Sequence, residues 1–441
     1  MARSITRRAA LGGAAAASAL SLSACLAQPG GESGGGSGSG GGSGEGGPVT
    51  ILGAFGGQEQ EAFLASLQPF MDESGIEIQY TADQDFTTTI RTRIQAGDAP
   101  DIALFPQPGG LLEQAAAGKA LPLDDHLDIE SLKGSLISGF LDASTQDGKV
   151  YGAPMRMACK SLVWYPKAAY EAGGYSTSPA SMNELLDITS KIKATGIAPW
   201  SDAWGADQAT GWVGTDWLEE YMLRMYGPEV YDQWVAHEIP FNDPQVVAAL
   251  DRLGELLKGE GNVLGGVNTM INTAFSDAPL PLFEEKPTAM LMRQGNFISG
   301  FFPEDADVDA TIGVFAMPSF DDGFKGQPIL GGGDLAALFS DKKTAVDVLT
   351  FLASPKFGVE WAKAGGWLSP HTTFDAANYP DETTRSIAEI ASSAEVFRYD
   401  GSDLMPNAVG GGSFWTGMVE WLNGTKTSQQ VLDEIENGWP A

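Results

Sequence analysis

Strand-like and helix-like segments alternate strictly over the first part of the chain that can fold. Residues 49–52 are a short β-branched run, and 59–73 carry apolar side chains at the spacing of one helix face. An alternating segment follows at 76–80, a second helical segment at 86–96 and a third strand at 101–105. This order predicts an α/β fold with a parallel sheet and helices on its faces. In such folds, ligands bind beyond the carboxyl ends of the strands.

The rest of the chain has a mostly helical pattern. Ser181 followed by Glu184 is typical of a capping box, and Thr427 followed by Gln430 opens the last helix, which Gly438 is expected to end in the left-handed conformation. No apolar stretch after residue 48 is long enough to cross a membrane, and the chain length fits two or three domains, or two lobes. Helical periodicity recurs at 213–226, 245–258 and 342–353, and strand-like runs recur at 289–292 and 311–315.

The first residues have the features of a secretory signal peptide. Arg3, Arg7 and Arg8 precede an apolar, alanine-rich stretch at 9–22 that is too short to span a bilayer. The arginine pair either marks a twin-arginine signal, which exports folded proteins, or belongs to an ordinary positive region. We assign residues 1–24 to this signal peptide.

A cysteine and a low-complexity linker follow the signal peptide. The segment LSAC at 22–25 resembles a bacterial lipobox, so we expect Cys25 to carry the lipid that holds the protein at the extracellular face of the cell membrane. Residues 30–47 are almost entirely Gly and Ser, a composition that forms no core and gives a flexible linker. We therefore read 25–48 as a lipidated cysteine with its linker, and lipid as the only contact with the membrane.

Charge and composition exclude several classes of function. The formal net charge is −31, which repels nucleic acid and makes a strongly anionic ligand unfavourable. With Cys25 lipidated, Cys159 is left as a lone thiol, most simply a small buried hydrophobe. The three histidines are scattered, and no Cys/His cluster has metal-ligand spacing, so we expect neither a metal nor a cofactor.

Five short motifs occur in a characteristic order along the chain. They are AGDAPDI at 96–102, DGKVYGAP at 147–154, KSLVWY at 160–165, GGGDL at 331–335 and GSFW at 412–415. Together they resemble the extracellular solute-binding proteins of ATP-driven (ABC) transporters, of the carbohydrate type that includes maltose- and alpha-glucoside-binding proteins. The resemblance runs from about residue 49 to the end of the chain.

The resemblance implies a periplasmic-binding-protein-like fold of two α/β lobes that close on a ligand in the cleft between them. It places 49–155 and 316–368 in lobe one, and 156–315 and 369–441 in lobe two. The segment 151–154 is a plausible hinge strand, because Gly permits bending and Pro fixes φ. The implied function is binding without catalysis: a monomer that takes up a sugar or oligosaccharide, in particular an alpha-glucoside, and delivers it to the permease subunits of an ABC importer.

A sugar site needs two kinds of side chain. Hydroxyls require paired donors and acceptors, whereas the C–H faces of the ring prefer aromatic plates. Several residues also have a plain structural reading: Glu59 can cap its helix, Lys160 can be a solvated surface lysine, and Trp415 can plug the core. The candidate ligand-binding residues, from position and resemblance, are Gln58, Glu59, Phe105, Gln107, Lys160, Trp204, Gln294, Asn296, Asp334, Trp367 and Trp415.

Two departures and one rival function leave the ligand open. Ala158 and Ser201 stand where alpha-glucoside-type relatives commonly carry Asn and Cys, so the specific sugar is in doubt and no structural disulfide is expected. A secreted glycoside hydrolase would share the acidic surface and a Trp-rich cleft, but it needs two catalytic carboxyl groups about 5–10 Å apart. With 57 acidic residues, the sequence alone does not exclude that geometry.

Overall fold

The computed structural model describes residues 47–137 and 139–440. The predicted signal peptide, Cys25 and the linker up to residue 46 lie outside these ranges. The strands are β1 (Val49–Gly53), β2 (Ile78–Ala82), β3 (Ile102–Phe105), β4 (Thr145–Gln146), β5 (Lys149–Val150), β6 (Gly152–Cys159), β7 (Leu162–Pro166), β8 (Ala198–Trp200), β9 (Ala289–Arg293), β10 (Ile312–Ala316), β11 (Pro328–Leu338) and β12 (Val396–Tyr399).

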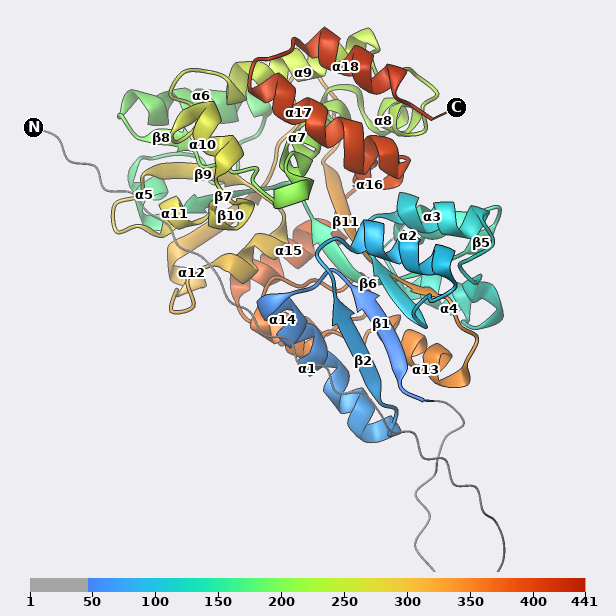
Figure 1. The fold of residues 1–441 in the computed structure, drawn as a ribbon. Coiled ribbons are helices and arrows are strands. Elements are labelled where there is room, and N and C mark those ends of the chain that lie inside the picture. The colour runs from blue at the N-terminus through green and yellow to red at the C-terminus, as the bar shows by residue number, and fades with distance from the viewer. Residues whose placement is uncertain (1–46, 138, 441) are drawn as a thin grey trace, which may run out of the picture. The chain divides into compact units, whose positions relative to one another are not determined.

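The helices pack around the strands, as Figure 1 shows. They are α1 (Gly57–Ser74), α2 (Phe86–Ala96), α3 (Pro108–Ala116), α4 (Ile129–Ser135), α5 (Lys167–Ala172), α6 (Met182–Ala194), α7 (Trp212–Tyr226), α8 (Pro228–Val235), α9 (Pro244–Leu257), α10 (Gly266–Asn272), α11 (Leu280–Phe283), α12 (Val308–Thr311), α13 (Lys343–Leu352), α14 (Val359–Ala364), α15 (Glu382–Ser392), α16 (Gly401–Leu404), α17 (Phe414–Leu422) and α18 (Ser428–Asn437), with a 3₁₀ segment η5 (Asn296–Phe301) between β9 and α12.

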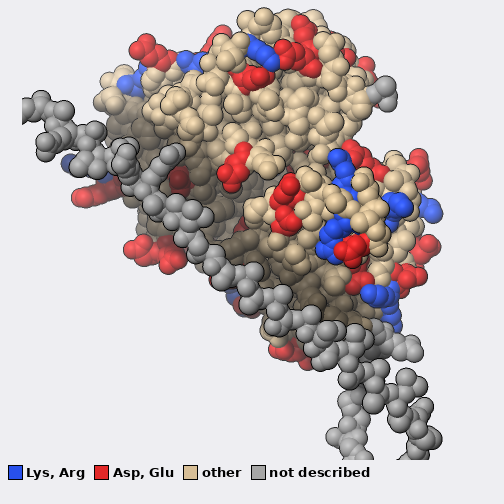
Figure 2. Space-filling view, in the orientation of Figure 1, with Lys and Arg blue, Asp and Glu red and all other residues tan. Residues whose placement is uncertain are grey.

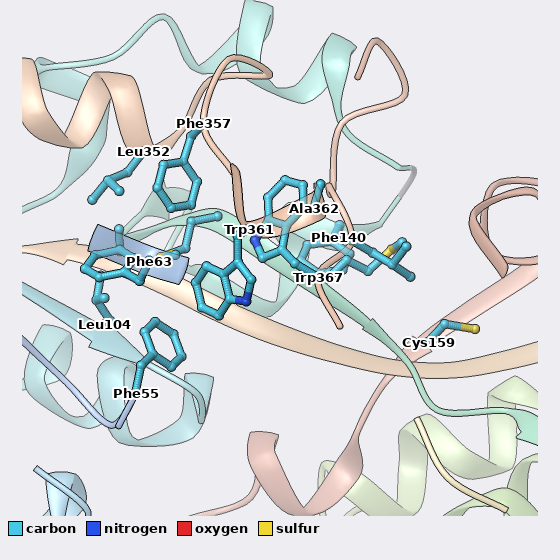
Figure 3. Close-up of a cluster of buried hydrophobic side chains, with 14 of the residues drawn as sticks. Phe55, Phe63, Leu104, Phe140, Cys159, Leu352, Phe357, Trp361, Ala362 and Trp367 are labelled. Carbon is cyan, nitrogen blue, oxygen red and sulfur yellow. The ribbon is translucent and has the colours of Figure 1, made fainter. Parts of the chain in front are cut away.

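The larger sheet holds the first lobe together. Its order is β12-β11-β3-β1-β2, and β6 pairs with β11 beside this path. β1 is parallel to both β2 and β3, as the alternating sequence predicts, because helices α1 and α2 carry the chain back between strands. Phe63 of α1 packs on Trp361 of α14 with ring centroids 6.0 Å apart, and Figure 3 shows both rings in the core beside Phe55.

The smaller sheet, of order β10-β7-β9-β8, lies in the second lobe. β7 is central and antiparallel to both neighbours, and its residues are buried throughout. The adjoining helix α7 is also buried over most of its length and packs against α8, α9 and α17. This helix therefore buries charged as well as apolar side chains, among them Asp216, Glu220 and Arg224.

Crossover segments connect the two lobes. β6 leaves the larger sheet, turns at Lys160 and Ser161, and continues as β7 of the smaller sheet. The chain returns from β10 through β11, whose pairing with β6 shifts register between Asp334 and Leu335. A later segment crosses beside them, where Leu368 bridges to β6. The predicted two-lobe fold with hinge crossovers is therefore confirmed, while the predicted lobe boundaries stay predictions; β12 pairs with β11 in the larger sheet.

The predicted helix ends are partly right. Thr427 and Gln430 form the expected capping box at the start of α18. Ser181 caps α6, but the Glu184 side chain accepts a 2.7 Å hydrogen bond from the Ala180 backbone N–H instead of from Ser181. The left-handed end at Gly438 is wrong: its φ is −90°, because its N–H still bonds back to the last turn of α18.

Two further expectations concern membrane-spanning helices and the Cys159 thiol. None of the helices in the described ranges combines the length and the apolar character that crossing a bilayer requires. Cys159 is a buried thiol in the core, and burial raises its pKa to about 12, which leaves it protonated and unreactive.

Candidate functional site

A pocket of about 240 Å³ opens between elements that follow strands of the two different sheets. One wall is the segment from Gly56 to Glu59, at the start of α1 directly after β1. The facing wall is Phe297, Gly300 and Phe301 of η5, which follows β9 of the smaller sheet. Trp361, Gly365 and Gly366 line the end of the pocket. The pocket thus lies in a cleft between the lobes, beyond the carboxyl end of a strand.

Arg156 of β6 forms part of the cleft floor. Its Nη1 donates to Glu59 Oε1 at 2.7 Å, and its Nε donates to Asp334 Oδ2 at 2.6 Å. The guanidinium lies 4.8 Å from the ring centroid of Phe55 and 5.1 Å from that of Trp361, two side chains that Figure 3 shows next to each other. Burial would lower the pKa of Arg156, but the two carboxylates raise it overall, so this side chain is a permanently charged, fixed group.

Lys160 lies where the chain passes from β6 to β7, and it is buried rather than solvated. Its Nζ donates to Asp216 Oδ1 at 3.0 Å and to Asp400. Asp216 is also bonded by Arg293 Nη1 at 3.1 Å, and Arg293 in turn contacts Glu220. Burial would raise the pKa of Asp400, but the Lys160 ammonium holds it well below its usual range. This ion network therefore fixes the crossover turn to α7, β9 and α16.

Asp216, Glu219 and Asp400 place one oxygen each within 4.8 Å of one another, an arrangement that can hold a metal ion. The Lys160 ammonium already contacts two of the three carboxylates. Glu219 instead accepts from the backbone N–H groups of Gly401 and Ser402, so each of the three carboxylates has a partner within the protein.

Asp403 brings a further carboxylate beside Lys160. It follows Asp400, whose Oδ1 caps α16 by accepting from the Asp403 N–H at 3.2 Å. The side-chain amide of Gln107, at the end of β3, faces the Asp403 carboxylate from the first lobe. Burial, followed by repulsion from Asp400, raises the pKa of Asp403 well above its usual range.

Aromatic side chains form the wall of the second lobe. The Trp212 ring, at the start of α7, lies 5.9 Å from Phe297 and 5.5 Å from Lys160 Nζ. Gly211 before it packs so closely on Trp415 that a Cβ there would lie 2.3 Å from the Trp415 carbonyl oxygen. Trp415 is half-buried, and its indole N–H has no partner within the described ranges. Phe297, Trp212 and Trp415 thus follow one another along the cleft.

Two of the sequence-predicted residues, Gln58 and Glu59, line the pocket. Asp334 is joined to Glu59 through Arg156, whereas Lys160, Gln107 and Trp415 belong to the neighbouring groups described above. Gln58 is exposed at the pocket mouth. A Cβ at Gly411 would lie 3.4 Å from Gln107 Nε2 and 3.7 Å from the Trp415 ring, so these two side chains approach the same point from opposite lobes. Whether these groups contact a ligand stays a prediction.

The structure places the other five away from the cleft, and three of these are rings in the core. Phe105 packs on Phe86 of α2, and Trp204 is fully buried with its N–H donating to Asp202. Trp367 is 1% exposed and packs between other aromatic rings, as its place in the cluster of Figure 3 shows. All three rings pack in the core, so their position lends no support to a stacking role, and their contact with a ligand stays a prediction.

Gln294 and Asn296 are buried and bonded to the backbone. Gln294 Oε1 accepts from the Gly295 N–H at 2.9 Å. Asn296 Oδ1 accepts from the Cys159 N–H at 2.7 Å, and its Nδ2 donates to the Gly366 carbonyl at 3.3 Å. Their side chains hold crossover and turn backbone in place instead of reaching the pocket, which is lined by Phe297 next to them.

Sequence reasoning missed Arg156, Trp212 and Asp403. Arg156 is the one charged residue in an otherwise apolar segment from 152 to 159, a signal that it has a buried partner. Trp212 directly follows a glycine at a helix start, and Trp415 follows Gly412 by three residues in a similar position. Asp403 had no local signal, because only the fold brings it to Lys160 and Gln107.

Comparisons with known proteins agree with this architecture. Residues 56–358 match the family described as bacterial extracellular solute-binding protein. The osmoprotective compounds-binding protein GgtB of Synechocystis is 42% identical over 89% of this chain and 92% of its own length. The alpha-glucosides-binding periplasmic protein AglE of Rhizobium meliloti is 36% identical over 89% of this chain and 87% of its own length.

Solved structures show the same fold at low sequence identity. A chitin oligosaccharide binding protein superposes with a TM-score of 0.75 at 19% identity, covering 89% of this chain and 98% of that one. Maltose-bound MalE3 of T. maritima gives a TM-score of 0.67 at 19% identity, covering 88% and 98%. A family match over most of the chain, a relative at 42% identity and a cleft between two lobes lead to one conclusion: this chain belongs to the bacterial extracellular solute-binding proteins.

Proposed function

We propose that the protein binds an uncharged sugar or short oligosaccharide, with α-glucosides the favoured class, and delivers it to the permease of an ABC importer. The observation that carries the proposal is the cleft itself, which has aromatic rings on one wall and fixed charged and amide groups on its floor. Phe297, Trp212 and Trp415 supply the rings, and Arg156, Asp334 and Gln107 lie opposite or below them.

The two kinds of group match the two surfaces of a sugar. Ring C–H groups gain from burial against indole and phenyl faces, whereas hydroxyls need both donors and acceptors at fixed positions. The names of GgtB and AglE add support, since both describe small extracellular solutes and one of them describes alpha-glucosides.

The function proposed is capture without chemistry. The crossover segments let the lobes close over a ligand by hinge bending, and closure would bring Gln107 and Trp415 onto it from the two sides. Figure 2 shows Asp and Glu spread over this face of the molecule, with several Lys and Arg on the lobe that holds α2. The net charge of −31 disfavours binding of nucleic acid or of an anionic ligand, which fits an uncharged ligand.

A screen for ligand-induced thermal stabilisation with mono- and oligosaccharides tests the proposal. We expect a stabilising hit among α-glucosides that remain chemically unchanged after incubation. Trp415→Ala should fold and lose the hit, while Trp439→Ala, which removes a half-buried indole stacked on His237, should keep it. No stabilisation by any glycoside would refute the function, and hydrolysis products would favour a glycoside hydrolase instead.

We also propose that Cys25 carries the lipid anchor, so that the protein acts at the extracellular face of the membrane, as a monomer. In a bacterial expression host, the wild-type protein should enter the membrane fraction and incorporate labelled fatty acid. Cys25→Ser should do neither and should leave sugar binding intact. A Cys25→Ser protein that still partitions with membranes would argue against lipid as the anchor.

A further inference from the structure

The cations around the cleft floor are already paired. Arg156 contacts Glu59 and Asp334, with side-chain exposures of 16%, 38% and 4%. Lys160 contacts Asp216 and Asp400, and the fully buried Arg293 contacts Asp216 and Glu220. Each of these cations therefore has two carboxylate partners within the protein, which already balance its charge.

Glu59 occupies the position that an anionic ligand would need. It stands in the first turn of α1, where backbone N–H groups without helical partners favour negative charge. It also takes the Nη1 edge of Arg156, a guanidinium group that binds carboxylates well. The helix start and Arg156 together would form a site for an anion, and Glu59 fills it with the protein's own carboxylate at the lining of the pocket.

We propose that Glu59 is a specificity-determining residue that makes the cleft select uncharged glycosides and reject their uronate counterparts. The inference rests on the proposed function and adds its charge selectivity. A neutral sugar donates hydroxyl hydrogens to carboxylate acceptors, so Glu59 does not oppose it. A uronate would have to displace Glu59 from Arg156 or lie beside it, and like charges in a partly buried cleft repel strongly.

Arg156 is held in place by contacts other than Glu59, so a change at Glu59 can be tested without moving the guanidinium. The buried carboxylate of Asp334 holds Arg156 Nε, and the rings of Phe55 and Trp361 hold the guanidinium plane. In Glu59→Gln, the guanidinium therefore stays in place while its Nη1 edge loses a charged partner. Gln also keeps an acceptor oxygen near the position of Glu59 Oε1.

The experiment compares matched ligands that differ only in one carboxylate: methyl α-glucoside against methyl α-glucuronide, and maltose against its terminal uronate. Calorimetry on the full chain gives the ratio of the two affinities for wild type, Glu59→Gln and Glu61→Gln. Glu61 is an exposed residue of the same helix, so its variant has the same change in net charge without touching the cleft.

We expect wild type and Glu61→Gln to discriminate against the uronates equally, within about twofold. Glu59→Gln should shift the ratio toward the uronates by about tenfold or more, with an unchanged melting temperature in the absence of ligand. An unshifted ratio in Glu59→Gln, or wild type that binds uronates as well as glucosides, would overturn this inference alone. If wild type binds no uncharged glycoside, both this inference and the proposed function fail.

Discussion

The side-chain oxygen of Asn296 accepts a 2.7 Å hydrogen bond from the backbone N–H of Cys159, at the end of β6. The amide nitrogen of Asn296 donates to the carbonyl of Gly366, in another segment that runs beside β6. One buried side chain thus ties η5 to two segments near the hinge. Because Phe297 follows directly and lines the pocket, the pocket wall and the residue that holds the crossover backbone are adjacent in the chain.

Asn296→Ala should lower the free energy of unfolding by about 1–3 kcal/mol, because it leaves the buried Cys159 N–H without its acceptor. Urea unfolding followed by circular dichroism measures this change. Asn268→Ala, at an exposed position, should change stability by less than about 0.5 kcal/mol. Equal effects of the two substitutions would contradict a structural role for Asn296.

Lys160→Met should be more damaging, by about 3–5 kcal/mol, because Asp216 and Asp400 are left buried without their shared ammonium. Burial already raises the pKa of Asp216 to about 7, whereas the ammonium holds that of Asp400 below its usual range. Without the ammonium, burial should raise the folded pKa of Asp400 above the unfolded value as well, so the variant loses stability as pH rises through these folded pKa values. Unfolding experiments should therefore find a larger deficit at pH 8 than at pH 5. Lys343→Met, at an exposed position, serves as the control, and a deficit independent of pH would speak against this explanation.

Asp202 gives a pH dependence of its own. Its Oδ2 accepts from the indole N–H groups of Trp204 and Trp217, yet burial raises its pKa to about 6. A raised pKa contributes stability that is present below about pH 4 and is lost as pH rises through 6. Asn does not titrate, so the Asp202→Asn variant does not lose this stability as pH rises. Between pH 4 and pH 7.5, its free energy of unfolding should therefore rise by up to about 3 kcal/mol relative to that of wild type. Parallel stability–pH curves for the two proteins would show that Asp202 does not titrate in this window.

Trp212→Leu tests the aromatic wall. Leucine retains apolar packing against Phe275 and Phe297 but removes the flat ring face, so affinity for the ligand found in the thermal screen should fall by about tenfold or more. Calorimetry measures the affinity, with Trp439→Leu as the matched control, whose affinity should be that of wild type. A Trp212→Leu protein with undiminished affinity would remove this ring from the site.

The fold was largely accessible from sequence because its signals are local. Periodic apolar spacing located α1, α2 and the first strands to within a few residues, and Thr427 with Gln430 identified the cap of α18. The failure at Gly438 has a local cause as well: glycine permits a left-handed end but does not require one.

The site could be predicted only in part, because the direction in which a side chain points depends on tertiary packing and not on its neighbours in the sequence. Trp204 and Trp415 both lie in or next to glycine-containing segments, yet one indole packs into the core beside Gly214 and the other borders the cleft. Irregular backbone therefore indicated where a side chain could leave the regular elements, but not which way it turns. The lone charge of Arg156 in an apolar segment indicated a buried partner, but only the fold showed that the partner is Asp334, and Asp403 had no such signal.

The larger sheet begins with β1 at residue 49 and takes its last strands, β11 and β12, from positions beyond 327. The sheet therefore cannot be completed until residue 399 has left the ribosome, on the order of tens of seconds after synthesis begins. During that interval the unfinished polypeptide is available to chaperones and to a translocase that threads unfolded chains. Folding is thus delayed by topology itself, since a lobe assembled from both ends of the sequence is completed only near the end of translation.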